Sequence, residues 1–219
     1  MASNGRRIAV LISGEGSNLQ ALIDAARAGR ITGTIAVVVS NRAAARGLER
    51  ARTAGIPARH LGAKPFADRA AYDAALAALL AEHDPDVVVL AGFMRILGPE
   101  FIAPFAGRTL NVHPSLLPKY PGLDTHRRVL EAGDREHGAT VHLVTEDLDM
   151  GPRVLQYRLA VRPGDTPESL QQRVHAGEHL ILPRAVDWLA TGRLKVGTGG
   201  VMLDGAALSE PVVVLEGER

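Results

Sequence analysis

Short runs of β-branched residues alternate with helical patterns along the chain, and this alternation limits the possible folds more than any other feature. The runs at 37–39 and 87–90 are apolar without a break, as in strands that are buried on both faces. Segments with apolar residues at helical spacing lie between such runs. The pattern predicts a largely parallel sheet covered by helices.

The individual elements follow from this pattern and from the turn residues between the runs. Strands are expected at 7–13, 34–40, 58–61, 86–91, 109–113, 140–144 and 154–161. Helices are expected at 18–28, 43–54, 67–82, 125–132 and 166–189. No helix-length segment separates the last two strands, so we expect them to pair antiparallel.

The expected fold is a single α/β domain with a Rossmann-like mixed sheet. Its strands are parallel in the N-terminal half, and antiparallel strands are added in the C-terminal half. Residues 1–196 form the main part of this domain, and residues 197–219 add short strands and a tail to it.

Composition excludes several classes of function. The 219 residues include 25 basic and 24 acidic ones, and a net charge of +1 gives no footprint for nucleic acid or an anionic membrane. The absence of cysteine excludes a disulfide scaffold, a thiol nucleophile and a thiolate metal site. The longest apolar run, 87–94, is far shorter than the ~18 residues of a membrane span. We therefore expect a cytoplasmic protein whose partners are small molecules.

A glycine loop joins the first predicted strand to the first helix. In a doubly wound sheet such a loop lies at the carboxyl ends of the strands, where ligands bind. Gly14 and Gly16 allow close backbone approach, and amides at a helix N-terminus attract phosphate. Ser17 and Gln20 also have the spacing of a capping box, so a purely structural role stays open. Leu19 occupies the place of the third glycine in a dinucleotide fingerprint, so a single phosphate is favoured over NAD.

Asn111 and His113 lie two residues apart on a predicted strand and therefore share one face. Pro114 ends the strand directly after them. An amide donor beside an imidazole suits acyl chemistry, because the amide stabilises an oxyanion and the imidazole moves a proton. On spacing alone, a histidine that merely ends a strand is an equally good interpretation. The chain has no Gly-x-Ser-x-Gly elbow, so a serine hydrolase is not favoured.

The segment at 113–122, His-Pro-Ser-Leu-Leu-Pro-Lys-Tyr-Pro-Gly, resembles the signature loop of the folate-dependent formyltransferases. Segments 12–14, 16–20, 91–97 and 136–138 narrow the likeness to the branch that formylates glycinamide ribonucleotide. The likeness extends from about residue 8 to residue 194. It implies the formyltransferase fold, and transfer of formyl from 10-formyltetrahydrofolate to the glycyl amine of glycinamide ribonucleotide in purine biosynthesis. The resemblance further implies direct amine attack through a tetrahedral intermediate, in a monomer or homodimer.

The resemblance also assigns residues to the site. The family's catalytic residues are matched by Asn111, His113 and Asp149. Its ribonucleotide site is matched by Gly16, Ser17, Asn18 and Glu178. Its folate site is matched by Arg69, Met94, Arg95, Ile96, Leu97, Asn111, Thr145, Glu146, Asp147, Leu148 and Asp149. A carboxylate near an imidazole favours the charged ring, which is the role that the resemblance gives Asp149.

Three positions depart from the residues that are usual in this family. Glu15 stands where asparagine is common, Asp124 where histidine or asparagine is, and Met150 where glycine is. Glu15 lies inside the glycine loop, so its side chain is expected to point outward, away from a bound anion.

Other functions remain as alternatives. The formyltransferase that acts on initiator methionyl-tRNA shares the proline-rich signature, but it would need a further domain and a basic surface. Formyltetrahydrofolate hydrolase would need an N-terminal regulatory domain, whereas the first strand here begins by Arg7. A non-catalytic nucleotide-binding module would explain the glycine loop, but not Asn111, His113 and Asp149 together.

The remaining histidines give weaker signals. His175, Glu178 and His179 fit the pattern His-x-x-Glu-His, which can bind zinc on a helix. This short pattern is weak evidence in a chain with eight histidines, and Gly177 is a poor residue inside a helix that holds metal ligands. We therefore expect no metal. His142 alternates with apolar residues and is interpreted as an ordinary strand residue.

Overall fold

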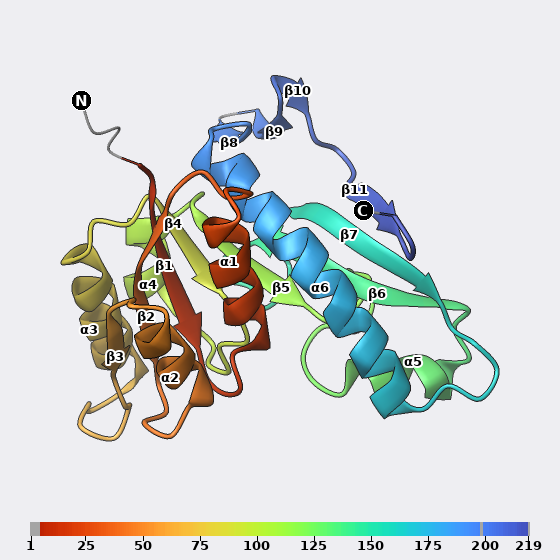
Figure 1. The fold of residues 1–219 in the computed structure, drawn as a ribbon, viewed down its shortest axis with the longest axis horizontal. Helices are drawn as coiled ribbons and strands as arrows, with labels where there is room; N and C mark the ends of the chain where they lie inside the picture. The colour runs from red at the N-terminus through yellow and green to blue at the C-terminus, as the bar shows by residue number, and fades with distance from the viewer. Residues whose placement is uncertain (1–4, 198, 219) are drawn as a thin grey trace.

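The computed structural model describes residues 5–197 and 199–218, and a twisted eight-stranded sheet forms its centre (Figure 1). The strand order is β11-β7-β6-β5-β4-β1-β2-β3. The strands are β1 (Arg7–Ile12), β2 (Thr34–Ser40), β3 (Ala58–His60), β4 (Val87–Leu90), β5 (Thr109–His113), β6 (Glu136–Leu143), β7 (Arg153–Ala160) and β11 (Val212–Leu215).

The sheet is mixed in the predicted way. Strands β1 to β5 pair parallel to their neighbours, whereas β6 pairs antiparallel with both β5 and β7. The loop at 144–152 is too short for a crossover helix, so β7 turns back beside β6. Strand β6 begins at Glu136, earlier than expected, because the polar and glycine-containing segment at 136–138 hides its first residues from a hydrophobicity pattern.

The helices cover both faces of the sheet. They are α1 (Ser17–Arg27), α2 (Arg46–Thr53), α3 (Arg69–Ala81), the short α4 (Pro99–Ile102) with a 3₁₀ turn η1 (Ala103–Phe105), α5 (Thr125–Ala132) and α6 (Pro167–Ala190). Helices α1 and α6 contact each other on one face, and α3 contacts α4 on the other (Figure 1). The sequence pattern does not predict α4 and η1, because both segments are short and each contains a proline. Within the described residues, every helix is too short or too polar to cross a membrane.

Alternate residues of the central strands enter two separate cores. Val87 and Val89 of β4 pack beneath α1 and α6, whereas Val88 and Leu90 pack beneath α3. Since both faces are covered, each position along the strand is buried. This packing is the physical reason for the uninterrupted apolar runs in the sequence.

Gly177 lies inside α6, where glycine weakens a helix. A Cβ atom at this position would overlap the ring of Tyr157 on β7. The glycine therefore allows α6 to lie directly on the sheet, which brings the neighbouring Glu178 into the interior, where it is 3% exposed.

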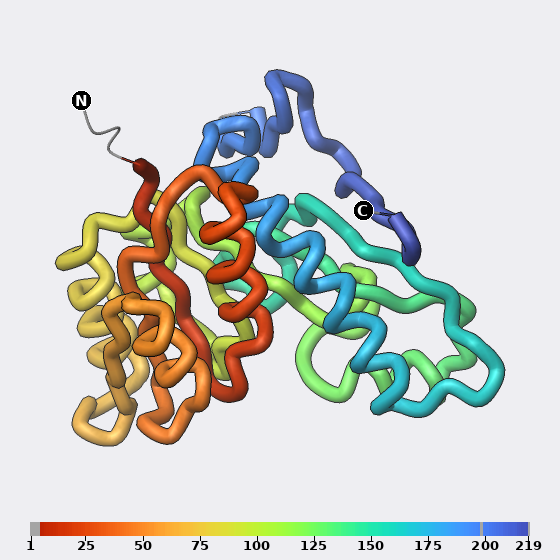
Figure 2. The backbone as a smooth tube through the Cα atoms, in the orientation of Figure 1, coloured from red at the N-terminus to blue at the C-terminus, as the bar shows by residue number. Residues whose placement is uncertain are grey.

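The C-terminal segment forms two structures. Strands β8 (Leu194–Gly197), β9 (Gly200–Leu203) and β10 (Ala206–Ala207) make a small antiparallel sheet. The chain then returns to the main sheet, where β11 pairs parallel with β7 (Figure 2). Arg173 of α6 holds this return by ion pairs of 2.8 Å with both Glu216 and Asp165.

Candidate active site

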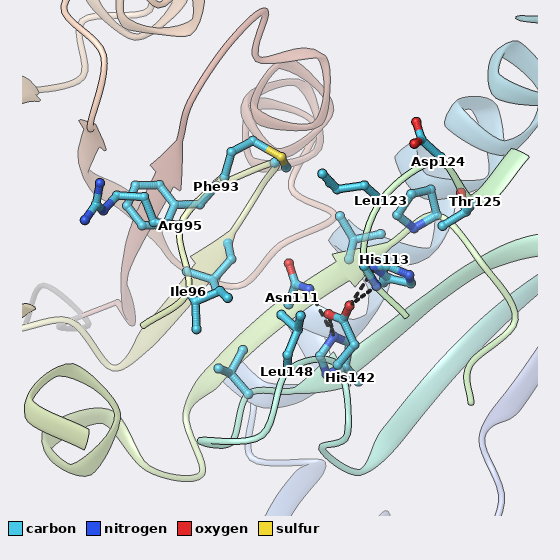
Figure 3. A pocket seen from close by; sticks show the side chains of 18 of the residues that line it. Phe93, Arg95, Ile96, Asn111, His113, Leu123, Asp124, Thr125, His142 and Leu148 are labelled. Carbon is cyan, nitrogen blue, oxygen red and sulfur yellow. Dashed lines mark hydrogen bonds and ion pairs between the residues drawn. The ribbon is translucent and has the colours of Figure 1, made fainter. Parts of the chain in front are cut away.

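A cavity of about 1010 Å³ lies at the carboxyl ends of β4 and β5 (Figure 3). Its walls include the β4–α4 loop (residues 91–98), the end of the proline loop (residues 114–122) and the β6–β7 loop (residues 144–152). The position agrees with the rule that ligands of open α/β sheets bind beyond the carboxyl ends of the strands.

The structure brings Asn111, His113 and Asp149 together at this cavity. Asn111 and His113 end β5 on one face, as their spacing predicts. Asp149 comes from the β6–β7 loop, and its Oδ2 lies 3.3 Å from Nδ1 of His113. The side chains of this pair are only 7% and 6% exposed, so solvent screens their interaction little.

Both ring nitrogens of His113 face acceptors. Nε2 lies 2.9 Å from the carbonyl oxygen of Tyr120 in the proline loop, and a carbonyl can only accept a hydrogen bond. Nδ1 faces the carboxylate of Asp149, which also accepts from the backbone N–H of Gly122 at 2.9 Å. The ring of His113 is thus held between two oxygen acceptors, one from the proline loop and one from the β6–β7 loop.

His142 belongs to the same cluster, and the sequence interpretation missed it. Its Nε2 lies 3.0 Å from Nδ2 of Asn111 and 3.7 Å from Oδ1 of Asp149 (Figure 3). The interpretation as an ordinary strand residue overlooked that β6 pairs with β5 in a register that sets His142 opposite Asn111. Only that register could have revealed the contact, because 31 positions separate the two residues.

The glycine loop forms an uncapped helix N-terminus. Gly16 precedes α1 in the left-handed conformation, with φ of 74°, and no side chain caps the helix. The capping box that the spacing of Ser17 and Gln20 left open does not form, because the helix begins at Ser17 and the Gln20 amide forms hydrogen bonds with Asp24 and Arg50. The first amides of α1 remain without a side-chain partner, which suits an anion.

Glu15 points away from these amides, as expected. Its carboxylate accepts a hydrogen bond from Arg50 at 2.6 Å and forms an ion pair with Arg46 at 3.1 Å. The hydrogen bond from Arg50 holds the pKa of Glu15 below its ordinary value. Two guanidinium groups thus offset a negative charge that would otherwise repel a phosphate.

Asn18 and Glu178 meet between α1 and α6. Nδ2 of Asn18 donates to Oε2 of Glu178 at 2.7 Å, and burial raises the pKa of Glu178 to about 7. In the His-x-x-Glu-His pattern, the carboxylate of Glu178 is thus hydrogen-bonded to Asn18. The rings of His175 and His179 stack on each other, with centroids 6.3 Å apart. Across the described part of the chain, no three side chains of metal-binding type gather at one point.

The β4–α4 loop is fixed near its middle and at its last residue by buried polar side chains. Oγ of Ser13 accepts from the N–H of Met94 at 2.7 Å, and Oδ2 of Asp73 accepts from the N–H of Gly98 at the same distance.

The predicted folate residues that line the cavity are Met94, Arg95, Ile96, Leu97, Asn111, Thr145, Glu146, Asp147, Leu148 and Asp149. Arg69 begins α3 and lies outside the cavity wall.

Comparison with known proteins gives a consistent result. The sequence profile of the formyl transferase family matches residues 6–186. The Escherichia coli (strain K12) phosphoribosylglycinamide formyltransferase is 55% identical over 201 residues, which cover 92% of this chain and 95% of that protein. The human trifunctional purine biosynthetic protein adenosine-3 is 46% identical over 194 residues, which cover 89% of this chain and 19% of that protein. A solved structure of the Coxiella burnetii phosphoribosylglycinamide formyltransferase superposes with a TM-score of 0.91 at 48% identity, covering 95% of this chain and 98% of that one.

Proposed function

The chain belongs to the formyl transferase family, and on that premise we propose that it formylates glycinamide ribonucleotide in de novo purine biosynthesis. The formyl donor in this proposal is 10-formyltetrahydrofolate. The observation that carries the proposal is the buried contact of His113 with Asp149, beside Asn111 at the cavity. Relatives that carry the name phosphoribosylglycinamide formyltransferase, similar over nearly the whole chain, support the choice of acceptor.

Each substrate has a proposed place. The phosphate of the ribonucleotide binds the free amides at Gly16, Ser17 and Asn18, and Glu178 receives its ribose hydroxyls. The pterin of the donor enters the cavity between residues 94–97 and 145–149. Arg69 lies outside the cavity wall, so its proposed contact is with a part of the donor that extends beyond the cavity.

The proposed reaction is a direct transfer. The glycyl amine attacks the formyl carbon, a new C–N bond forms, and the carbonyl electron pair moves to oxygen. Asn111 donates to this oxyanion, and the imidazolium of His113 stabilises it, held in place by Asp149. The electron pair on the oxygen then re-forms the carbonyl, and the bond from the carbon to the folate nitrogen breaks. One proton leaves the attacking amine and one reaches the folate nitrogen. For His113 to carry protons between them, one of its ring nitrogens gives up its contact with Tyr120 or Asp149 during the reaction.

A transfer assay with both substrates tests the proposal. We expect tetrahydrofolate to form only when donor and ribonucleotide are both present, and each of them to raise the melting temperature alone. NAD, at the same concentration, is the matched ligand control and should give no shift. Stabilisation by both ligands without transfer would favour a binding module, and release of formate without the ribonucleotide would favour a hydrolase.

We also propose that the chain acts in the cytoplasm, as one domain and as a monomer or homodimer. The pairing of β11 with β7 supports the single domain, because the last strand extends the main sheet. Sedimentation velocity over a range of protein concentrations would decide between monomer and dimer.

A further inference from the structure

His142 is a buried titratable side chain that has no part in the reaction described above. It is 2% exposed and lies opposite Asn111 in the antiparallel ladder of β5 and β6. Side chains that face each other across such a ladder lie on the same side of the sheet and interact. The ladder of β6 with β7 shifts its register between Val141 and His142, an irregularity that changes how the side chains on β6 face β7.

The hydrogen bonds of His142 define one tautomer. Nδ1 lies 3.0 Å from the carbonyl oxygen of Leu143, which can only accept, so Nδ1 carries a hydrogen. Nε2 lies 3.0 Å from Nδ2 of Asn111, which can only donate, so Nε2 offers its lone pair. The ring is therefore neutral, with its proton on Nδ1.

The reversed amide of Asn111 does not fit these contacts. An amide oxygen facing Nε2 would require a hydrogen on Nε2. A neutral ring would then turn its Nδ1 lone pair toward the Leu143 carbonyl, and a doubly protonated ring would be a buried cation. Burial lowers the pKa of His142, against opposing contributions from the Leu143 carbonyl and from Asp149, and the neighbouring His113 lowers it further.

The charged groups around His142 do not form hydrogen bonds that would change this neutral tautomer, with its proton on Nδ1. Asp149 lies 3.7 Å from Nε2, beyond hydrogen-bonding distance. Arg153 faces His142 in the register of β7, but its guanidinium donates to the carbonyl of Leu117 and pairs with Glu210.

We propose that His142 is the positioning residue that fixes which end of the Asn111 amide meets the reacting carbonyl. The proposal rests on the function proposed above. His142 occupies one of the two N–H groups of Asn111, so the other N–H remains for the oxyanion and the amide oxygen for the attacking amine. Figure 3 shows the amide oxygen on the side away from His142. A reversed amide would place oxygen lone pairs where negative charge develops, and the stabilisation would be lost.

Two substitutions separate the two contacts of His142. In His142→Gln, the amide oxygen reaches the place of Nε2 and can still accept from Asn111. In His142→Asn, the shorter amide can still donate to the Leu143 carbonyl but falls short of Asn111. We expect His142→Asn to lower kcat roughly 10- to 100-fold with little change in either KM, and His142→Gln to retain kcat within about threefold. Equal loss in both variants, or no loss in His142→Asn, would overturn the proposal.

A double-mutant cycle distinguishes positioning from a general structural role. When Asn111→Ala is already present, His142→Asn should change kcat by less than about twofold, because the amide that it positions is gone. A loss as large as that in the parent protein would mean that His142 acts on the fold rather than on Asn111.

Nitrogen-15 NMR of labelled histidine reads the tautomer directly, without any assay of activity. We expect Nδ1 of His142 to be protonated and Nε2 unprotonated at neutral pH in the unmodified protein, and a proton on Nε2 would contradict the proposal. This measurement decides the matter even where His142→Asn does not fold. It also stands if no formyl transfer is found, in which case the proposed function fails separately.

Discussion

In the proposed function, the glycine loop (residues 13–18) and the active-site corner (Asn111, His113, His142 and Asp149) would recognise ligands by opposite means. The loop uses consecutive residues and backbone amides, so its shape follows from local conformation. The corner uses side chains from two strands and a distant loop, and each is held by hydrogen bonds to another buried group. The difference indicates that changes in the loop should act on affinity for one substrate, whereas changes in the corner should act on the rate.

The largest expected effect is that of Asp149→Asn. The substitution removes the charge that faces Nδ1 of His113, and the amide that replaces it could turn an N–H toward that nitrogen. We expect kcat to fall roughly 10²-fold or more, the scale of lost acid–base catalysis, with the KM of the ribonucleotide nearly unchanged. Steady-state kinetics measures both constants, and Glu49→Gln, an exposed loss of charge on α2, is the control. An equal rise of both KM values without loss of kcat would contradict the division between loop and corner.

Gly16→Val, a substitution in the glycine loop, should produce the next largest effect, and it should act on substrate affinity rather than on kcat. A Cβ atom at Gly16 would lie 2.7 Å from Cα of Gly47, and the left-handed φ of 74° also disfavours a branched side chain. We expect the KM of the ribonucleotide to rise at least about tenfold, while the folate KM changes little, together with a stability loss of about 1–3 kcal/mol.

Gly14→Ala is the matched control for Gly16→Val. A Cβ atom at Gly14 meets nothing within 4 Å, and its φ is not positive. The melting temperature of the Gly14→Ala variant should stay close to that of the parent protein. If the two variants lost stability equally, the close approach of the loop to α2 would not be the cause.

Glu178, which accepts a hydrogen bond from Asn18 of the glycine loop, adds a dependence on pH. Its folded pKa of about 7 lies above the ordinary value of 4.5, so folding favours the protonated form. The stability that this provides is complete below pH ~4.5 and is lost as pH rises through ~7, up to about 3 kcal/mol. Glu178→Gln keeps an acceptor for Asn18 but cannot titrate. The difference in melting temperature between the two proteins should therefore change across this range, and parallel curves would refute the assignment.

Glu15→Asn should have the smallest effect. It removes a carboxylate from the glycine loop and releases Arg46 and Arg50 from their ion pairs. We expect the KM of the ribonucleotide to fall by a few-fold at low ionic strength, and the difference to shrink in high salt, because these groups are exposed. The measurement is KM at two salt concentrations, with Glu49→Gln as the control. A fall that salt does not change would indicate a change of loop shape rather than of charge.

The fold could be predicted further than the site. The order of strands and helices followed from apolar runs and turn residues, and the antiparallel turn from the short loop between β6 and β7. The start of β6 and the α4–η1 segment could not be predicted from the hydrophobic pattern, because polar residues and prolines interrupt it there. In the site, the pairing of Asn111 with His113 was readable from the spacing of two. The contact of His142 with Asn111 was not, because it depends on the register of β6 with β5.

The sequence by itself determined the alternation of strands and helices, the glycine turn before α1 and the common face of Asn111 and His113. These features depend on backbone geometry over a few neighbouring residues, which side-chain pattern controls directly. Only the tertiary structure decided that Asp149 reaches His113, that His142 meets Asn111 and that Glu178 bonds Asn18. Those contacts join segments far apart in the chain, and they form only where strand register, loop closure and the close packing of α6 on β7 bring buried polar groups within hydrogen-bonding distance.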